Sequence, residues 1–280
     1  MNDTKTNIIK VYGKNIDSFF QNIITNNIES LNNDNSIYTA ILSPQGKYLH
    51  DFIMIKENNF FLIEANDNKI SSLIKEIKKY DIRNEIKIEE QKDLITSVII
   101  KENLHDNYLE KINEKKKFKD KDYLFFIDPR SESFLYRFWF NKNFNHNNEL
   151  NFSTEKNVET KRISLSIPNT NKDLIYNKSF ILNYNFENIN AISFDKGCYI
   201  GQENTARQKY RGSQKYSLKT IKIIEGNLPN SNHDLFIKNM KIGTIKSSSN
   251  DLCLCLLRTS NEIKKNEKFK TDTGLTFKAL

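Results

Sequence analysis

Apolar positions in the first half of the chain alternate between the two-residue period of strands and the three-to-four-residue period of helices. Strand-like runs occupy residues 8–12, 37–42, 48–55, 60–64, 86–89, 94–100, 123–127 and 134–140. Helical spacing begins near Ile16 and again near Ile70, and a lysine-rich helix is expected between residues 103 and 117. Strands and helices are therefore mixed throughout this region, which predicts an α+β body.

Polar residues mark the ends of several of these elements. Asn15 is expected to cap the first helix, and Asn66 or Asp67 the second. Between two expected strands, Pro44-Gln45-Gly46-Lys47 has the composition of a tight turn, because proline presets φ and glycine accepts positive φ. The asparagine-rich residues 141–151 are typical of a loop or linker, and short helices are expected over residues 155–161 and 201–209.

The pattern changes after Gly212. Short strand-like runs without helical periodicity predict a small all-β barrel or sandwich. These runs lie at residues 218–224, 235–237, 241–245, 252–258 and 275–279. We therefore expect an α+β region over residues 1–212, with a break near 90–100 or 141–151, and a C-terminal β-barrel domain over residues 213–280.

Composition limits the location that we expect. The 280 residues are 38% hydrophobic and 28% charged, which is ordinary for a soluble protein. No apolar run approaches the roughly 18 residues that a membrane span needs. The first ten residues have neither the apolar core of a signal peptide nor the pattern of a transit peptide. We expect a cytoplasmic protein that does not associate with membranes.

The formal net charge of +8 suggests contact with nucleic acid, since phosphate neutralisation dominates such binding. Only seven of the 43 basic residues are arginine, however, and the lysines are scattered along the chain. This pattern favours a solvated lysine-rich surface over a dedicated nucleic-acid footprint, and leaves contact with RNA open.

Common catalytic and metal-binding motifs are missing from the sequence. The four histidines are far apart, no CxxC pair exists, and no phosphate-binding loop, GxGxxG or GxSxG is present. We therefore predict no metal site. Cys253 and Cys255 would lie on one face of a strand, about 6–7 Å apart, which is too far for a disulfide. They are expected to be small buried core residues.

One segment concentrates unusual residues. Three of the eight glycines, Gly197, Gly201 and Gly212, lie between Lys196 and Gly212, around Cys198. A neighbouring lysine and a following helix N-terminus both favour a reactive thiolate, while a structural cysteine in a tight loop is the equal alternative. Glu203 and Arg207 have the spacing of a helical ion pair, and Arg211 could bind a carboxylate or hold the junction to the β domain.

This segment, Lys196-Gly197-Cys198-Tyr199-Ile200-Gly201-Gln202-Glu203 with Ala206-Arg207 and Tyr210-Arg211-Gly212, resembles the signature of the YgfZ-type folate-binding proteins, relatives of the glycine-cleavage aminomethyltransferase. Other segments resemble the same family. They are Leu42 to Lys47, Asp128-Pro129-Arg130 with Arg137, Arg162-Ile163 with Ile167-Pro168, Ile192-Ser193-Phe194, and Leu254 to Arg258. The chain departs from the family pattern at Asn183, Asn190-Ala191 and Ser166, and has no counterpart of the acidic motif of the aminomethyltransferases.

The resemblance implies ferredoxin-like α+β units and a C-terminal β barrel around a central site for tetrahydrofolate or a derivative. It implies a monomeric accessory factor, rather than an enzyme, that supports assembly or repair of iron–sulfur clusters in client proteins, including tRNA-modifying enzymes. Cys198 would be the functional thiol. The implied folate or motif residues are Lys196, Gly197, Tyr199, Gly201, Gln202, Glu203, Arg207, Arg211 and Asn185.

Two alternatives accompany this interpretation. One is a tetrahydrofolate-dependent aminomethyltransferase, and the other is a tRNA- or RNA-binding factor that uses the basic surface. On the implied ligand, we expect Lys196, Arg207 or Arg211 near the central cavity to meet the carboxylates of the folate. The single tryptophan, Trp139, lies in an aromatic strand and is expected in the core rather than against the pterin.

Overall fold

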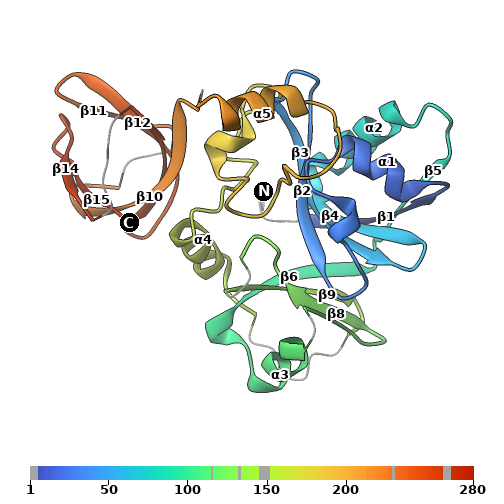
Figure 1. The fold of residues 1–280 in the computed structure, drawn as a ribbon. Coiled ribbons are helices and arrows are strands. Elements are labelled where there is room, and N and C mark those ends of the chain that lie inside the picture. Colours follow the sequence, from blue (N-terminus) through green and yellow to red (C-terminus); the bar gives the residue numbers. More distant parts are fainter. Residues whose placement is uncertain are drawn as a thin grey trace.

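The computed structural model describes residues 6–114, 116–131, 134–144, 152–212, 214–228, 231–260 and 266–280. Within these residues the strands form three antiparallel sheets, two in the body and one in the C-terminal region (Figure 1). This mixed architecture confirms the predicted α+β fold class. No helix in the described part of the chain is long and apolar enough to cross a membrane.

The first sheet has five strands in the order β2-β3-β4-β1-β5. Its elements are β1 (Thr6–Gly13), α1 (Ile16–Ile23), β2 (Ser36–Leu42), β3 (Tyr48–Glu57), β4 (Phe60–Asn66), α2 (Ile70–Tyr80) and β5 (Ile86–Glu90). Helices α1 and α2 cover one face, where Phe20 and Leu73 pack with Phe52. Asn15 is the N-cap residue of α1, as predicted, although it adopts φ 53° and its side chain makes no capping hydrogen bond.

The second sheet has the order β6-β9-β8-β7. Its elements are β6 (Leu94–Ile100), α3 (Asp106–Glu114), β7 (Lys117–Lys119), β8 (Tyr123–Ile127) and β9 (Leu135–Asn141). Helix α3 covers one face through Tyr108, and the other face shares a core with the first sheet, where Trp139 is 1% exposed. Trp139 is thus a core residue, as predicted. The sequence pattern missed β7 because three residues carry no measurable period.

The segment between the second sheet and the C-terminal sheet is mostly irregular. It contains α4 (Glu155–Ser164) and α5 (Gln202–Tyr210). Four short 3₁₀ helices complete the helical elements of the described residues: η1 (Ile28–Ser30), η2 (Asp67–Lys69), η3 (Lys101–Asn103) and η4 (Ile181–Tyr184). The loop expected over residues 141–151 lies largely outside the described residues.

The C-terminal sheet curls into a half-barrel with the order β11-β12-β13-β10-β15-β14 (Figure 1). Its strands are β10 (Tyr216–Glu225), β11 (Asp234–Ile237), β12 (Met240–Ser249), β13 (Leu252–Arg258), β14 (Lys268–Lys270) and β15 (Thr276–Ala279). Next to the edge strand β14, Asp272 bonds the backbone of Phe236, Lys238 and Asn239, which draws the two edges together. Cys253 and Cys255 are fully buried in its core, as predicted.

His50 on β3 is a buried polar residue with an energetic consequence. Its side chain is 2% exposed, and neither ring nitrogen has a hydrogen-bond partner among the described residues. Burial, assisted by the charge of Lys69, lowers the pKa of His50 to about 4. The folded protein therefore holds this ring neutral, while the unfolded chain protonates it near its ordinary pKa of about 6.5.

We expect the free energy of unfolding to fall as the pH drops through the window from about 6.5 to about 4. The loss should reach at most roughly 3 kcal/mol, because the unfolded state binds a proton that the folded state excludes. Urea unfolding between pH 4 and 7 would measure it. His50→Leu should remove this part of the pH dependence, and His105→Leu, at an exposed position, should retain it. Equal slopes for wild type and His50→Leu would contradict the prediction.

Candidate functional site

The segment around Cys198, residues 196–212, is called the glycine-rich segment. Lys196 anchors it to the end of α1. Its side chain is buried, and Nζ donates to the carbonyl oxygens of Gln21, Ile24 and Asn26 at 2.7, 2.7 and 2.8 Å. These contacts use the three donors of an ammonium group. Burial lowers the pKa of Lys196 to about 7, while the three carbonyls favour the protonated form. The ammonium is thus engaged with backbone oxygens rather than with the Cys198 thiol, contrary to the basis of the expected thiolate activation.

Further hydrogen bonds join the same two parts of the chain. The backbone N–H of Ser193 donates to Thr25 O at 3.1 Å, and that of Ile200 donates to Asn22 O at 3.1 Å. The hydroxyl of Thr25 donates to Ala191 O at 2.7 Å. Residues 191–200 are therefore held along their length against the end of α1.

Gly201 closes the segment against the turn that precedes β3. Its φ is +84°, and a Cβ at this position would lie 2.5 Å from Ser43 O and 3.1 Å from the Cα of Gly46. Gly46 itself has φ +74°, as the predicted turn requires. Two segments that resemble the same family in sequence thus touch in space, and glycine is needed because of both the backbone angle and the close approach.

Gly197 and Cys198 form the exposed tip between two buried residues, Lys196 and Tyr199. A Cβ on Gly197 would have no neighbour within 4 Å. The other two cysteines are buried, and burial raises the pKa of the Cys253 thiol to about 12. Of the three cysteines, Cys198 alone is placed to meet another molecule.

The remaining predicted residues of the segment lie on or near α5. Arg207 pairs with Glu203 at 2.8 Å on an exposed surface, which is the predicted helical pair. Arg211 is exposed at the C-terminal end of α5, and Gln202 is half-buried. Asn185 lies apart from them: it is buried, and its amide donates to Ser166 O and Leu218 O at 3.0 Å each, which ties the body to β10.

A cavity of about 140 Å³, which we call the central cavity, lies where the two body sheets, α4 and residues 168–171 meet. Residues that line it include Tyr38, Asp51, Glu64, Arg130, Arg137 and Arg162. None of the glycine-rich segment is part of this lining. Lys196, Arg207 and Arg211 lie outside this lining, because Lys196 is bound to the end of α1 and α5 lies beside η4 and the residue 43–47 turn.

Buried ion pairs make one wall of the cavity. Glu64 on β4 accepts from Arg137 Nη1 at 2.6 Å and from Trp139 Nε1 at 2.7 Å, both on β9. Asp128 accepts from Arg137 Nε at 2.8 Å and from Arg130 Nη2 at 2.7 Å. Burial alone would raise the pKa of Asp128, but the charges of Arg130 and Arg137 hold it well below its usual range.

A tyrosine-rich group makes another wall. Asp51 accepts from the hydroxyls of Tyr38 and Tyr48, and Lys69 Nζ donates to Tyr48 Oη at 3.0 Å. Burial, together with the charge of Asp51, raises the pKa of both tyrosines well above the ordinary value. Both hydroxyls therefore remain protonated donors. Sequence reasoning missed Glu64, because its partners Arg137 and Trp139 are distant in the chain, and it also missed Asp51, whose partners Tyr38 and Tyr48 are nearer.

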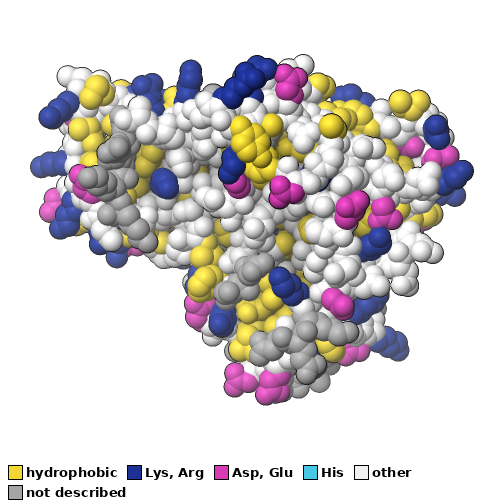
Figure 2. All heavy atoms as spheres, in the orientation of Figure 1, with side chains coloured by type: hydrophobic (Ala, Val, Ile, Leu, Met, Phe, Trp, Pro, Cys, Tyr) yellow, Lys and Arg dark blue, Asp and Glu magenta, His cyan; other side chains and the backbone are white. Residues whose placement is uncertain are grey.

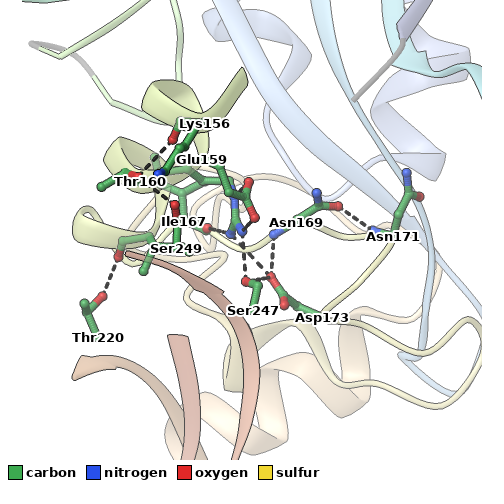
Figure 3. Close-up of polar contacts among 12 residues, drawn as sticks. Lys156, Glu159, Thr160, Ile167, Asn169, Asn171, Asp173, Thr220, Ser247 and Ser249 are labelled. Atoms are coloured by element: carbon green, nitrogen blue, oxygen red, sulfur yellow. Dashed lines mark hydrogen bonds and ion pairs between the residues drawn. The ribbon is translucent and has the colours of Figure 1, made fainter. Parts of the chain in front are cut away.

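The third wall joins the half-barrel to the body (Figure 3). Arg162 on α4 donates to Glu159 at 2.6 Å and, across to β12, to Ser247 Oγ at 2.8 Å. Its Nη1 also lies 3.4 Å from Asp173 Oδ2, which accepts from the backbone of Asn169 at 2.6 Å. Among the described residues, no group of three or more His, Cys, Asp or Glu side chains is placed to hold a metal ion.

Comparison with known proteins adds relatives along most of the chain. The chain is 29% identical to "Iron-sulfur cluster assembly factor IBA57 homolog, mitochondrial" of Neurospora crassa over 245 residues, which cover 81% of this chain and 54% of that protein. It is 24% identical to "tRNA-modifying protein YgfZ" of Aliivibrio fischeri over 96% of this chain and 87% of that protein. No protein-family model matches.

A solved structure agrees with the fold. The glycine cleavage system aminomethyltransferase T from Bartonella henselae superposes with a TM-score of 0.74 over 98% of this chain and 82% of that chain, at 11% identity. Relatives named IBA57 and YgfZ thus match along most of the chain, and the fold is that of the aminomethyltransferase. This confirms the resemblance read from the glycine-rich segment. The chain spans about half the length of the IBA57 homologue that it matches.

In this relative of IBA57 and YgfZ, the predicted site residues separate into three groups. Lys196, Tyr199 and Gly201 hold the segment in place, and Gly197 and Cys198 form its exposed tip. Glu203, Arg207 and Arg211, on or next to α5, are exposed to solvent instead. The cytoplasmic location stays a prediction, since relatives named mitochondrial are among the matches.

Gly197 and Gly201, which lie on either side of Cys198, should respond differently to substitution. Gly201→Ala should lower the free energy of unfolding by roughly 2–5 kcal/mol, because it adds backbone strain to overpacking against Ser43 O. Gly197→Ala, which meets open space, should change it by less than about 1 kcal/mol. Guanidinium unfolding of both variants measures the difference, and equal losses would contradict the assigned roles.

Proposed function

We propose that this protein is an accessory factor that supports assembly or repair of iron–sulfur clusters in client proteins, including tRNA-modifying enzymes. The observation that carries the proposal is its similarity to relatives named for iron–sulfur cluster assembly and for tRNA modification. The exposed Cys198 supports it, since a factor that acts on clients needs a group that reaches beyond its own surface.

The construction of the tip suits a thiol that meets a partner. The side chains of Lys196 and Tyr199, on either side of the tip, are buried. They hold the backbone between them in place, while Cys198 stays exposed. A thiol in this position can contact a cluster or a persulfide of a client without local unfolding. We propose Cys198 as the functional thiol on this ground. A monomer is sufficient for this role.

Cys198→Ala should keep the fold and lose function. In a bacterial strain that lacks its own YgfZ-type protein, wild type should restore the activity of iron–sulfur enzymes, and Cys198→Ala should restore no more than the empty vector. The physical reason is that only this thiol is accessible, as burial protects Cys253 and Cys255. Enzyme activity in extracts measures the outcome.

The control for folding is thiol labelling. Native wild type should react with iodoacetamide at one cysteine, and native Cys198→Ala at none, while both should unfold at the same denaturant concentration. Full restoration of activity by a folded Cys198→Ala would assign the residue to shaping the loop and would overturn its proposed role.

We further propose that tetrahydrofolate or a derivative binds in the central cavity rather than beside the glycine-rich segment. A pterin carries a carbonyl acceptor and several N–H donors along one edge. The cavity offers both complements: the carboxylates of Asp51 and Glu64, and the guanidinium groups of Arg130 and Arg137. Nη1 of Arg130 and Nη2 of Arg137 have no hydrogen-bond partner among the described residues, which leaves donors for a ligand.

The ring-sized volume of about 140 Å³ fits the head group, so that the rest of a folate would extend out of the cavity. When bound, the folate would supply one-carbon or redox chemistry. The residues of this chain would bind and orient it: the buried ion pairs fix the arginines, and the protonated tyrosines donate to Asp51 and hold its side chain in place. An accessory role and a transferase role both require this binding step.

Filling the cavity should block folate. Val98 lines the cavity on β6, and Ile95 is 39% exposed on the same strand. Saturating tetrahydrofolate should raise the melting temperature of wild type and of Ile95→Phe by several degrees, as expected for a ligand that binds only the folded state. Val98→Phe should abolish this shift, as measured by differential scanning fluorimetry under anaerobic conditions.

The arginines of α5 provide the contrasting result. If Arg207→Ala with Arg211→Ala removes the folate response and Val98→Phe retains it, the folate lies at the glycine-rich segment and the cavity assignment is wrong. If wild type shows no response at all, folate binding itself fails, which leaves the test of Cys198 unaffected.

A further inference from the structure

A second pocket, of about 370 Å³, lies between α5, η4 and the start of β10. We call it the α5–β10 pocket and define it by Phe180, Asn183, Arg207, Lys215 and Tyr216, with the amides of Asn204 and Gln208 completing the lining. Its volume falls in the range of about 300–1,000 Å³ that is usual for small-ligand sites. It is separate from the central cavity, with which it shares no lining residue.

The pocket combines flat apolar rings with positive charge. Phe180 and Tyr216 are half-buried, and the ammonium of Lys47 lies 3.2 Å from the centroid of the Phe180 ring. Arg207 and Lys215 are exposed at the rim. Figure 2 shows lysine and arginine side chains along the upper edge of the molecule, over α5 and the start of β10. Aromatic rings beside cations are the combination that binds bases and phosphates of single-stranded nucleic acid.

The charges at the rim are available to a ligand. The pair of Arg207 with Glu203 is solvent-exposed, and such pairs contribute little, so a phosphate can replace the carboxylate. Lys215 has no ion-pair partner among the described residues. Glu203 does not line the pocket, although it pairs with Arg207, which does. No other Asp or Glu is among the lining residues.

An unsatisfied polar atom points to a ligand with hydrogen-bonding edges. Oδ1 of Asn183 is buried and has no hydrogen-bond partner among the described residues. A buried amide oxygen without a partner costs roughly 1–3 kcal/mol, which an N–H donor of a ligand would recover. Asn204 and Gln208 add two more amides, and amide groups are the usual readers of base edges.

We propose that the α5–β10 pocket binds a nucleotide, with the base against Phe180 and Tyr216 and the phosphate at Arg207 and Lys215. The nucleotide can be free in solution or one unstacked residue of a single-stranded RNA. This site goes beyond the proposed iron–sulfur role and does not depend on folate binding. It places any RNA contact of this basic protein at one pocket rather than over the whole lysine-rich surface.

The test uses the full chain with two double variants of equal charge change. Arg207→Ala with Lys215→Ala alters the pocket, and Lys268→Ala with Lys270→Ala alters two exposed lysines on β14. Binding of a fluorescein-labelled single-stranded decamer RNA is followed by anisotropy from 50 to 200 mM salt. The pocket variant should bind at least tenfold more weakly, and its salt slope should be smaller by ~0.7, because one phosphate contact is lost. The β14 variant should change affinity by less than twofold.

A variant that keeps the charge tests the base. Asn183→Leu should weaken RNA binding severalfold at every salt concentration without changing the salt slope. AMP and CMP, measured by calorimetry, separate the two sources. If they bind with the same sensitivity to Asn183→Leu, the site takes free nucleotides; if only RNA binds, it takes a strand. Inorganic phosphate serves as the control for a contact with the phosphate alone.

Several outcomes would overturn the proposal. Equal weakening by both double variants would mean a diffuse electrostatic surface. Absence of binding by both RNA and nucleotides would exclude the ligand class. Competition of tetrahydrofolate with RNA in the Val98→Phe variant, whose central cavity is filled, would make the pocket a folate site instead. Unchanged unfolding midpoints of all variants are required throughout.

Discussion

The buried guanidinium of Arg137 is the interaction on which the rest of the body depends. It bridges Glu64 of the first sheet and Asp128 at the end of β8 in the second. Removing one partner of such a buried pair leaves an uncompensated charge, at a cost of about 3–5 kcal/mol. The two sheets are therefore held in one relative position. One wall of the central cavity follows from this, because Glu64 and Arg137 line it.

The glycine-rich segment is held in place by hydrogen bonds to the backbone and by close packing, rather than by an ion pair. A buried ammonium on three carbonyl oxygens and a glycine pressed against a turn fix both ends of a short exposed tip. The charge of Lys196, which in sequence lies two residues from Cys198, is thereby used for structure. The Cys198 thiol is accessible because it lies at the exposed tip of the segment. A lysine next to a cysteine in the sequence can thus have a structural role in the fold, since the free backbone carbonyls at a helix end accept its hydrogen bonds.

The half-barrel meets the body through Arg162, whose guanidinium contacts α4 and β12 together (Figure 3). This junction borders the central cavity, while the α5–β10 pocket lies where the chain passes from α5 into the half-barrel. The central cavity is lined by elements far apart in the chain, whereas the α5–β10 pocket is formed within residues 180–216. Such places leave space that no single element fills.

Sequence alone determined most of the elements and the resemblance to the YgfZ-type proteins. The apolar periods were sufficient for most strands and helices, because each depends on neighbours within a few residues. The segment around Cys198 was sufficient for the resemblance, because its glycines and polar residues are required by local backbone geometry. The periods did not reveal β7 and β14, with three residues each, or the short 3₁₀ helices, and the N-cap of α2 is Lys69 rather than Asn66 or Asp67, because η2 precedes this helix.

Tertiary structure alone decided what the residues around the sites do. Lys196 lies 170 or more positions from the carbonyls that it binds, and Glu64 lies 73 positions from Arg137. No local pattern encodes such pairs, since they form only when the sheets and the irregular segment pack together. For the same reason only packing decided which residues line the central cavity, among them Asp51, Glu64, Arg130 and Arg137, and that the arginines of α5 lie outside this lining.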